Sequence, residues 1–345
     1  MHVGLCGYPG AGKSTVFEAL APGATASRSG VSYGNIKVPD ARVDALAGLF
    51  SPKKTTFAEI TFVDVGGGGS AATGAFTPDV VQHMRNVDVM VHVVRGFANP
   101  MVATPMDPRR DDSLFNDEIL LLDLGVMERR LQRFHKERRQ GAEVEVTERC
   151  VAHLEDGGPL RTLALSEDDR DTLRDVQLLS LKPLIVLFNL GEAEWGEQEY
   201  AALRELKEPA PNTLSMAICG SIEVEIAQLD EEDQGEFLAT LGLREPARHE
   251  FVRASYRLLD LISFLTAGKD ECRAWPIHRG TVARRAARTI HSDIERGFIR
   301  AEVYRWEALI EHGSEAALKS KGLMRLEGKE YVVADGDVIN FRHNV

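Results

Sequence analysis

The stretch from Gly7 to Ser14, Gly-Tyr-Pro-Gly-Ala-Gly-Lys-Ser, constrains the fold of this chain more than any other. It fits the pattern G-x-x-x-x-G-K-[ST], and its surroundings suit that pattern. An apolar run from Val3 to Cys6 reads as a buried strand, and the run from Thr15 to Leu20 reads as a helix. A glycine-rich turn between strand and helix directs backbone N–H groups at an anion, and the helix N-terminus adds its positive dipole end. The sequence therefore predicts an α/β protein that binds a nucleotide.

Each position of this loop has an expected role. Lys13 should reach the β- and γ-phosphates as the catalytic cation, and the Ser14 hydroxyl should bind Mg²⁺. The alternative, an ordinary glycine-rich turn, is disfavoured because the complete motif lies between a strand and a helix. The residues expected to bind the nucleotide here are Gly7, Pro9, Gly10, Ala11, Gly12, Lys13, Ser14 and Thr15.

Composition limits the class of protein. A length of 345 residues suggests two or three domains, and a net charge of −12 is unfavourable for broad nucleic-acid binding. No apolar run reaches the ~18 residues of a membrane span, and a strand at the N-terminus leaves no room for a signal peptide. The four cysteines are scattered, as in a reducing compartment. We expect a cytoplasmic monomer with no membrane partner and no reading of DNA sequence.

A second motif follows the loop at the spacing expected of a P-loop protein. The run Phe57 to Asp64 reads as a strand that ends on a carboxylate, and Asp64 to Gly67 has the form D-x-x-G. Asp64 should hold Mg²⁺ through water, and Gly67 should face the nucleotide. Further apolar runs at 89–95, 184–188 and 213–218 predict a doubly wound, mostly parallel sheet.

The remaining chain divides into two further parts. Helical spacing of apolar residues predicts a helical hairpin at 111–180 inserted into a nucleotide domain of residues 1–110 and 181–261. Whether that hairpin has a partner or is only a solvated decoration stays open. Residues 262–345 predict a β-grasp module, with one helix at 281–295 and a strand hairpin at 329–341.

The base-reading motif departs from guanine-specific proteins. Where those carry N-K-x-D, this chain has Asn189-Leu190-Gly191-Glu192. Loss of the paired hydrogen bonds to guanine should relax guanine preference, so we expect ATP to bind at least as well as GTP. Asn189 would hold the P-loop or the base edge, the Leu190 backbone would meet the adenine amino group, and Glu192 replaces the aspartate. Gly220 occupies the last base-contacting loop and would act through its backbone.

These motifs together resemble the YchF / Obg-like ATPases over essentially the whole chain, as a divergent member. The segments that carry the resemblance are Gly7–Thr15, Val38–Asp40 with Arg42, Ile60–Asp64, His92–Arg95 with Phe97, Asn189–Glu192, Ile222–Ala227, Leu265–Gly268, Ile290–Glu302, Asp335–Val338 and Phe341–Val345. The resemblance implies a nucleotide domain, a helical coiled-coil insertion and a C-terminal TGS domain. It implies a preference for ATP, and binding to the ribosome (its large subunit) or RNA through the TGS and helical domains. Phe97 would line the base pocket, although a core phenylalanine is equally consistent.

Two departures bear on turnover. Gly68 lies where Ras-like proteins carry the catalytic glutamine, and Ser27 to Ser29 holds no clear equivalent of the switch threonine. The residues that position the phosphates are present, but the residue that would orient the attacking water is missing. The sequence therefore favours a slow Mg²⁺-dependent ATPase that acts as a switch in translation or stress regulation. The alternative is a nucleotide-gated ribosome- or RNA-binding module without hydrolysis. On the C-terminal module, Arg284, Arg288 and His291 would form an RNA-facing side or simply a solvated one.

Overall fold

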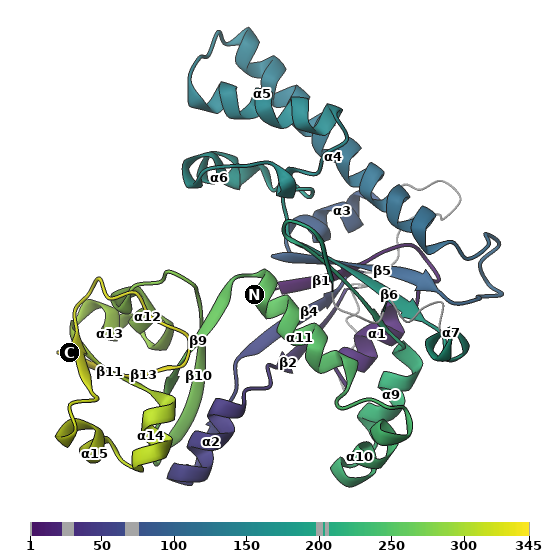
Figure 1. Cartoon of the computed structure of the whole chain (residues 1–345). Helices are drawn as coiled ribbons and strands as arrows, with labels where there is room; N and C mark the ends of the chain where they lie inside the picture. The colour runs from purple at the N-terminus through teal and green to yellow at the C-terminus, as the bar shows by residue number, and fades with distance from the viewer. Residues whose placement is uncertain (1, 23–30, 66–75, 198–202, 204–206, 345) are drawn as a thin grey trace. The chain divides into compact units, whose positions relative to one another are not determined.

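A computed structural model of the chain describes residues 2–22, 31–65, 76–197, 203 and 207–344 (Figure 1). The chain forms two compact units. The first comprises Met1–Ile36 and Thr61–Phe251, and the second comprises Lys37–Ile60 and Val252–Val345.

A seven-stranded sheet is the centre of the first unit. Its strands are β1 (His2–Cys6), β2 (Ser32–Lys37), β4 (Glu59–Asp64), β5 (Val89–Gly96), β6 (Leu184–Leu190), β7 (Lys207–Ala210) and β8 (Thr213–Ile218). They lie in the order β2-β4-β1-β5-β6-β8-β7. The five central strands β4, β1, β5, β6 and β8 pair in parallel, and β7 runs antiparallel to β8. The predicted doubly wound, mostly parallel sheet is confirmed.

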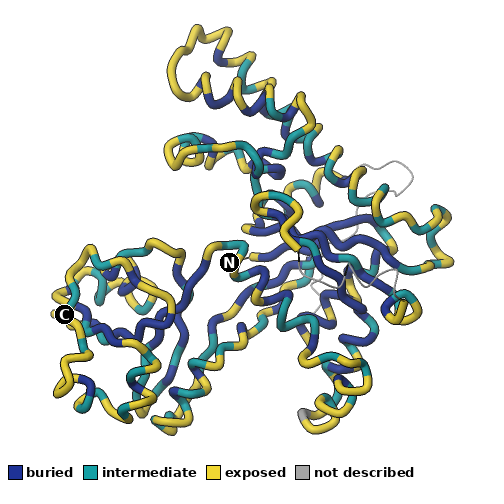
Figure 2. The backbone as a smooth tube through the Cα atoms, viewed as in Figure 1, coloured by how far each residue is buried: buried dark blue, intermediate teal, exposed yellow. Residues whose placement is uncertain are grey.

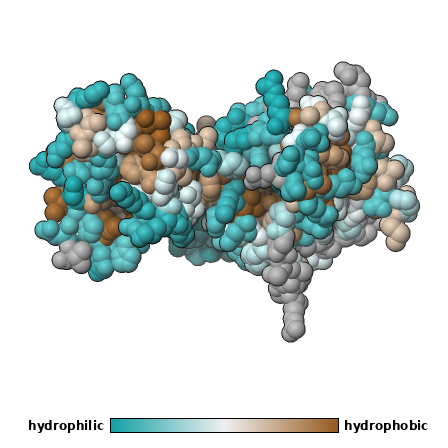
Figure 3. Space-filling model, turned by 90° about the horizontal axis from the view of Figure 1, so that it is seen from below, coloured by the Kyte–Doolittle hydropathy of each residue, from teal (hydrophilic) through white to brown (hydrophobic). Residues whose placement is uncertain are grey.

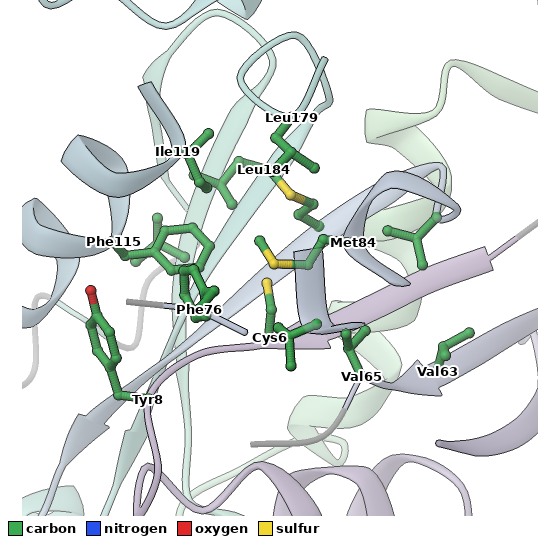
Figure 4. Packing of buried hydrophobic residues seen from close by; sticks show 14 of the residues in the cluster. Cys6, Tyr8, Val63, Val65, Phe76, Met84, Phe115, Ile119, Leu179 and Leu184 are labelled. Carbon is green, nitrogen blue, oxygen red and sulfur yellow. The ribbon is translucent and has the colours of Figure 1, made fainter. Parts of the chain in front are cut away.

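Helices cover both faces of this sheet. They are α1 (Lys13–Leu20), α3 (Pro78–Arg85), α4 (Pro108–Lys136), α7 (Glu192–Gly196), α9 (Gly220–Gln228), α10 (Glu231–Thr240) and α11 (Ala247–Leu258). Beneath α3 and the start of α4, buried side chains such as Cys6, Met84 and Phe115 form one core (Figure 4). None of the helices that the structure describes combines the length and apolar character of a membrane-spanning segment.

The inserted helical region is a hairpin of α4 and α5 (Ala142–Glu155), which run side by side (Figure 1). Two 3₁₀ turns, η1 (Leu160–Thr162) and η2 (Arg174–Val176), and the helix α6 (Glu167–Leu173) complete it. Met127 from α4 and Cys150 from α5 are fully buried in their shared core. A capping box between Ser166 and Asp169 begins α6.

A six-stranded sheet forms the second unit. Its strands are β3 (Lys54–Thr56), β9 (Leu261–Thr266), β10 (Glu271–His278), β11 (Phe298–Arg305), β12 (Arg325–Glu327) and β13 (Asp337–His343), in the order β12-β11-β13-β9-β10-β3. Its helices are α2 (Ala41–Phe50), α12 (Ala283–Ile290), α13 (Ser292–Arg296), α14 (Trp306–His312) and α15 (Glu315–Ser320). The buried alanines of α12 pack against this mixed sheet, as a β-grasp module requires.

Residues 37–60 belong to the second unit, whereas the sequence placed them in the nucleotide domain. The strand β3 pairs in parallel with β10, which leads α2 onto the C-terminal sheet. Arg42 binds both oxygens of Asp40 and also contacts Asp335, with the Nη1 and Oδ2 atoms 2.9 Å apart. The Arg42–Asp335 contact and the pairing of β3 with β10 join residues that are far apart along the chain, so local patterns do not reveal them.

Two local predictions for the C-terminal module are wrong. The expected helix at 281–295 is two helices, because His291 adopts an extended backbone (φ −162°, ψ 144°) between α12 and α13. His291 therefore does not continue the helical face of Arg284 and Arg288. The expected hairpin at 329–341 is absent from this described stretch: Val332 makes only an isolated bridge to Val282, and β13 pairs with β11 and β9 instead. The sequence also predicts a helix near residues 198–206, and this segment lies almost wholly outside the described residues.

Many of the buried residues lie along the strands of the two sheets. Figure 2 shows buried backbone along the central strands and exposed backbone at the tip of the α4–α5 hairpin. On the face drawn in Figure 3, hydrophilic residues predominate and hydrophobic ones lie in separate small groups. The four cysteines are buried and unpaired, in agreement with the expectation of reduced thiols.

Candidate functional site

The predicted P-loop joins the C-terminal end of β1 to the first turn of α1. Gly12 is the N-cap of α1 and adopts a left-handed conformation (φ 82°). Gly7 (φ 142°) and Gly10 (φ 80°) also have positive φ. Such angles are strained for residues with a Cβ atom, so the three glycines let the chain curl around an anion.

Two of these glycines also allow close approach of neighbouring groups. A Cβ atom on Gly7 would lie 2.5 Å from the backbone oxygen of Val93 on β5. A Cβ atom on Gly12 would lie 2.2 Å from the Nδ2 atom of Asn189. The loop is therefore fitted against the ends of two further strands of the sheet, β5 and β6.

Gly7→Ala should unfold the loop and abolish nucleotide binding. Strained backbone and the contact with a β5 carbonyl that cannot move aside together cost about 2–5 kcal/mol. Thermal unfolding followed by circular dichroism, and titration with ATP, would measure both effects. Gly48→Ala is the matched control, because nothing lies within 4 Å of its added Cβ atom inside α2. That change should stabilise the helix by about 0.5–1 kcal/mol. Equal stabilities for the two variants would contradict this account of the loop.

Lys13 is the last residue but one of the motif and the first residue of α1, and its side chain reaches back to the carbonyls of the loop. Its side chain is buried (7% exposed), and its Nζ atom donates to the carbonyl oxygens of Gly7 at 2.9 Å and Tyr8 at 3.0 Å. Burial lowers the pKa of the Lys13 ammonium, and the nearby Asp64 carboxylate acts to raise it. These two carbonyls hold the cation at the place where phosphate oxygens are expected.

The two expected Mg²⁺ ligands lie together. The Ser14 Oγ and Asp64 Oδ2 atoms are 3.4 Å apart, although the residues are separated by 50 positions. Both line a hollow of about 320 Å³ together with Pro9, Gly10, Gly12, Lys13 and Thr15. A hydroxyl and a carboxylate beside a phosphate site are the hard oxygen donors that Mg²⁺ takes, usually with phosphates and water as its other ligands. The described residues therefore fit this ion.

Asn189, near the end of β6, connects the P-loop to the first residue of α9. Its Nδ2 atom donates to the Ala11 carbonyl at 3.0 Å, and its Oδ1 atom accepts from the Gly220 N–H at 3.1 Å. The side chain is 4% exposed. Of the two roles left open for Asn189, the structure has the first: the side chain holds the P-loop. The Gly220 N–H donates to Asn189, and a contact of Gly220 with the nucleotide stays a prediction.

The remaining base-side residues lie beside this connection. Leu190 is buried at the end of β6, and Glu192 is exposed in the first turn of α7. The Phe97 ring is close to the loop, since its Cε1 atom would be 3.5 Å from a Cβ atom on Gly12. Phe97 is half-buried. Their contacts with a nucleotide stay a prediction. Gly67, Gly68 and Ser27 to Ser29 lie outside the described residues.

Sequence reasoning missed the segment after β5 as a support of the loop. The Asn99 Nδ2 atom donates to the Gly10 carbonyl at 3.1 Å, and Arg95 donates to the carbonyls of Thr104 and Pro105 at 2.8 and 3.1 Å. The buried Arg95 thus orders the segment that carries Asn99 to the loop. The segment His92–Arg95 with Phe97 carries part of the family resemblance and so marks this region as functional. Asn99 belongs to no recurring motif, so the sequence does not single it out.

His92 links the loop to the helical hairpin. Its Nδ1 atom lies 2.9 Å from Asp112 Oδ1, its ring stacks on Phe115 of α4 at 3.8 Å, and its edge faces Tyr8 of the loop. Complete burial lowers the pKa of His92, against the influence of Asp112. The neutral ring therefore packs like an aromatic residue at the base of α4. Figure 4 shows Tyr8 beside Phe76 and Phe115 in the same cluster.

Comparison with known proteins agrees with this geometry. Residues 261–344 match the family model YchF-GTPase_C, described as Protein of unknown function (DUF933). The Ribosome-binding ATPase YchF of Escherichia coli O157:H7 is 37% identical over 367 residues, covering 99% of this chain and 99% of that protein. The Ribosome-binding ATPase YchF of Bacillus subtilis (strain 168) is 36% identical over 366 residues, covering 100% of both. The structure of the Schizosaccharomyces pombe YchF GTPase superposes with a TM-score of 0.87 at 28% identity, covering 99% of this chain and 97% of that one. With relatives this similar along its whole length, the chain belongs to the YchF family.

Proposed function

We propose that this protein is a Mg²⁺-dependent nucleoside triphosphatase that binds ATP at least as well as GTP and associates with ribosomes in the cytoplasm. The observation that carries the proposal is the assembled phosphate site: Lys13 held in the loop, with Ser14 and Asp64 at 3.4 Å beside it. Ribosome association comes from the names of the relatives. Contact through the large ribosomal subunit, and action as a monomer, are part of the same proposal.

The chain's own groups would do most of the work in phosphoryl transfer. Loop N–H groups and the N-terminus of α1 would bind the phosphates, and Lys13 would move from the loop carbonyls onto their oxygens. Ser14 and Asp64 would hold Mg²⁺, which neutralises charge that develops on the phosphates. Asn189 keeps the loop in its phosphate-binding shape through Ala11. Each of these residues contributes position and charge, which is most of what this chemistry requires.

The relaxed base preference rests on the end of β6. Guanine selection needs a carboxylate that accepts two N–H groups at once, and the chain offers the longer Glu192 in an exposed first helical turn. A site that holds guanine by two hydrogen bonds rejects other bases by a factor of ~10⁴, because the wrong base leaves polar groups unpaired. Without a carboxylate that accepts both N–H groups, the site loses this discrimination. In this proposal the Leu190 backbone would meet the adenine amino group.

Calorimetric titration of the whole protein with ATP and with GTP, each with and without Mg²⁺, tests the proposal. We expect ATP to bind at least as tightly as GTP, and Mg²⁺ to strengthen both by about tenfold or more. Asp64→Asn should remove most of the Mg²⁺ effect, whereas Asp79→Asn, on an exposed carboxylate of α3 away from the hollow, should leave it intact. GTP binding far tighter than ATP would refute the base preference. Single-turnover hydrolysis of labelled ATP separates a slow enzyme from a module that only binds.

A further inference from the structure

A second hollow, which we name the arginine hollow, lies on the helical hairpin. It is lined by Val126, Arg129, Arg130, Arg133 and Val176, and its volume is about 270 Å³. The α4 residues recur at spacings of three and four, so they share one face of that helix. Val176 of η2 closes the hollow from the opposite side. No residue of the phosphate site takes part in it.

The charge of the arginine hollow is entirely positive. Three of its five lining residues are arginines, and no carboxylate is among the described residues that line it. The Arg129 and Arg133 side chains are exposed, and within the described parts of the chain neither guanidinium makes a hydrogen bond or an ion pair. A local cluster of cations stands out in a chain with a net charge of −12.

One of these arginines carries a donor without an acceptor. The Arg130 Nε atom is buried and has no hydrogen-bond partner among the described residues. Its Nη2 atom donates to the Thr172 carbonyl at 3.5 Å. A buried donor left without a partner is costly, and because this atom is closed to solvent, the groups free to contact a ligand are the exposed Arg129 and Arg133.

Two of the three arginines, Arg130 and Arg133, pack on the Phe134 ring. The Arg130 Cζ atom lies 5.0 Å from the centroid of the Phe134 ring, and the Arg133 Cζ atom lies 5.5 Å from it. Guanidinium groups stacked on a ring lose little further freedom when they bind. Each planar guanidinium group can donate two parallel hydrogen bonds to the oxygens of one phosphate group, and a chain of phosphates presents such oxygens repeatedly.

We propose that the arginine hollow binds the phosphate backbone of ribosomal RNA. The proposal rests on the ribosome association proposed above and assigns it to one face of α4. Arg129 and Arg133, both exposed, lie one helical turn apart and reach separate phosphate oxygens. The resemblance implies ribosome or RNA contact through the helical and TGS domains. The arginine hollow specifies the residues on the helical hairpin, and it is separate from the face of Arg284 and Arg288 on α12.

Charge reversal tests the proposal. The double variant Arg129→Glu/Arg133→Glu is compared with wild type, in ATP and Mg²⁺, for co-sedimentation with purified ribosomes and for binding to a short RNA duplex across a potassium chloride series. We expect about tenfold or greater loss of RNA affinity. We also expect a salt dependence shallower by about 0.7–0.9 for each phosphate contact removed.

The matched control is Arg109→Glu/Arg170→Glu, which makes the same change in net charge at two exposed arginines outside the hollow. It should bind RNA within about twofold of wild type, and both doubles should keep the wild-type ATP affinity and circular dichroism spectrum. Arg129→Lys/Arg133→Lys keeps the charge and should retain most of the salt dependence.

Three results would overturn the proposal. The first is equal RNA binding by the two charge-reversal doubles. The second is a polyglutamate peptide that binds as tightly as the RNA duplex, which would assign the hollow to an acidic protein. The third is a wild-type protein that binds neither ribosomes nor RNA. This last result also removes the ribosome association on which the proposal rests, while the ATP titrations still report separately on the nucleotide site.

Discussion

Lys13→Ala should reduce the affinity for ATP about 100-fold. The ammonium is buried at the phosphate site, where it would exchange two carbonyl partners for charged phosphate oxygens. A hydrogen bond to a charged group contributes about 1.5–3 kcal/mol, and about 3 kcal/mol corresponds to roughly 100-fold in affinity. Calorimetric titration with ATP and Mg²⁺ measures the loss directly. Hydrolysis in a single turnover should fall further, because the cation also stabilises charge on the transferred phosphate.

Two controls make this result specific. Lys13→Met retains an apolar stem in the buried position but removes the charge, and it should be as defective as the alanine variant. Lys53→Ala removes an exposed lysine that pairs with Asp270, with side chains 82% and 88% exposed. It should bind ATP like wild type and change stability by less than about 1 kcal/mol. ATP binding by Lys13→Ala within a few-fold of wild type would mean that the loop is not the phosphate site.

The phosphate site is predictable because its determinants are local. Gly7 to Ser14 requires positive φ at its glycines, and the structure has it at Gly7, Gly10 and Gly12. The partner carboxylate Asp64 was also found, because parallel strands deliver their C-terminal residues to one edge of a sheet. A strand ending in a carboxylate, β4, pairs with β1 in the register that brings Asp64 opposite Leu5.

Contacts between distant residues were beyond the reach of sequence patterns. The Asn189–Ala11 hydrogen bond joins positions 178 residues apart, and the motif alone allowed either a base contact or this one. Residues 37–60 read as part of an alternating α/β pattern, yet β3 pairs with β10 of the second unit. Sequence patterns identify helices and strands, but the pairing of strands that are far apart in the chain decides which sheet each strand joins.

The error at 281–295 has a different cause. The segment is helical in pattern on both sides of Ile290, so periodicity predicts one helix. His291 instead leaves the helical region, and its ring Nδ1 atom accepts from the Asp293 N–H as the cap of α13. Capping by a histidine is unusual, since Ser, Thr, Asp and Asn lead at that position. The predicted basic face of Arg284, Arg288 and His291 is lost with the break.

Asn189→Ala should destabilise the first unit and weaken nucleotide binding together. It leaves the Ala11 carbonyl and the Gly220 N–H without their partner at a site where Asn189 is 4% exposed. Each unsatisfied buried group costs about 1–3 kcal/mol, so about 2–5 kcal/mol of unfolding free energy should be lost. The affinity for ATP should fall about tenfold, because a loop free to leave its binding shape must be ordered again at each binding event.

Asn189→Asp separates the two hydrogen bonds. A carboxylate still accepts from the Gly220 N–H, but it places an oxygen against the Ala11 carbonyl and a negative charge near the phosphates. ATP affinity should therefore fall further than in the alanine variant, although one contact survives. Asn86→Ala, at an exposed asparagine that ends α3, is the control and should change neither property measurably. Wild-type melting and ATP affinity in Asn189→Ala would show that the loop keeps its shape without this side chain, and amide hydrogen exchange in residues 7–13 would report the difference.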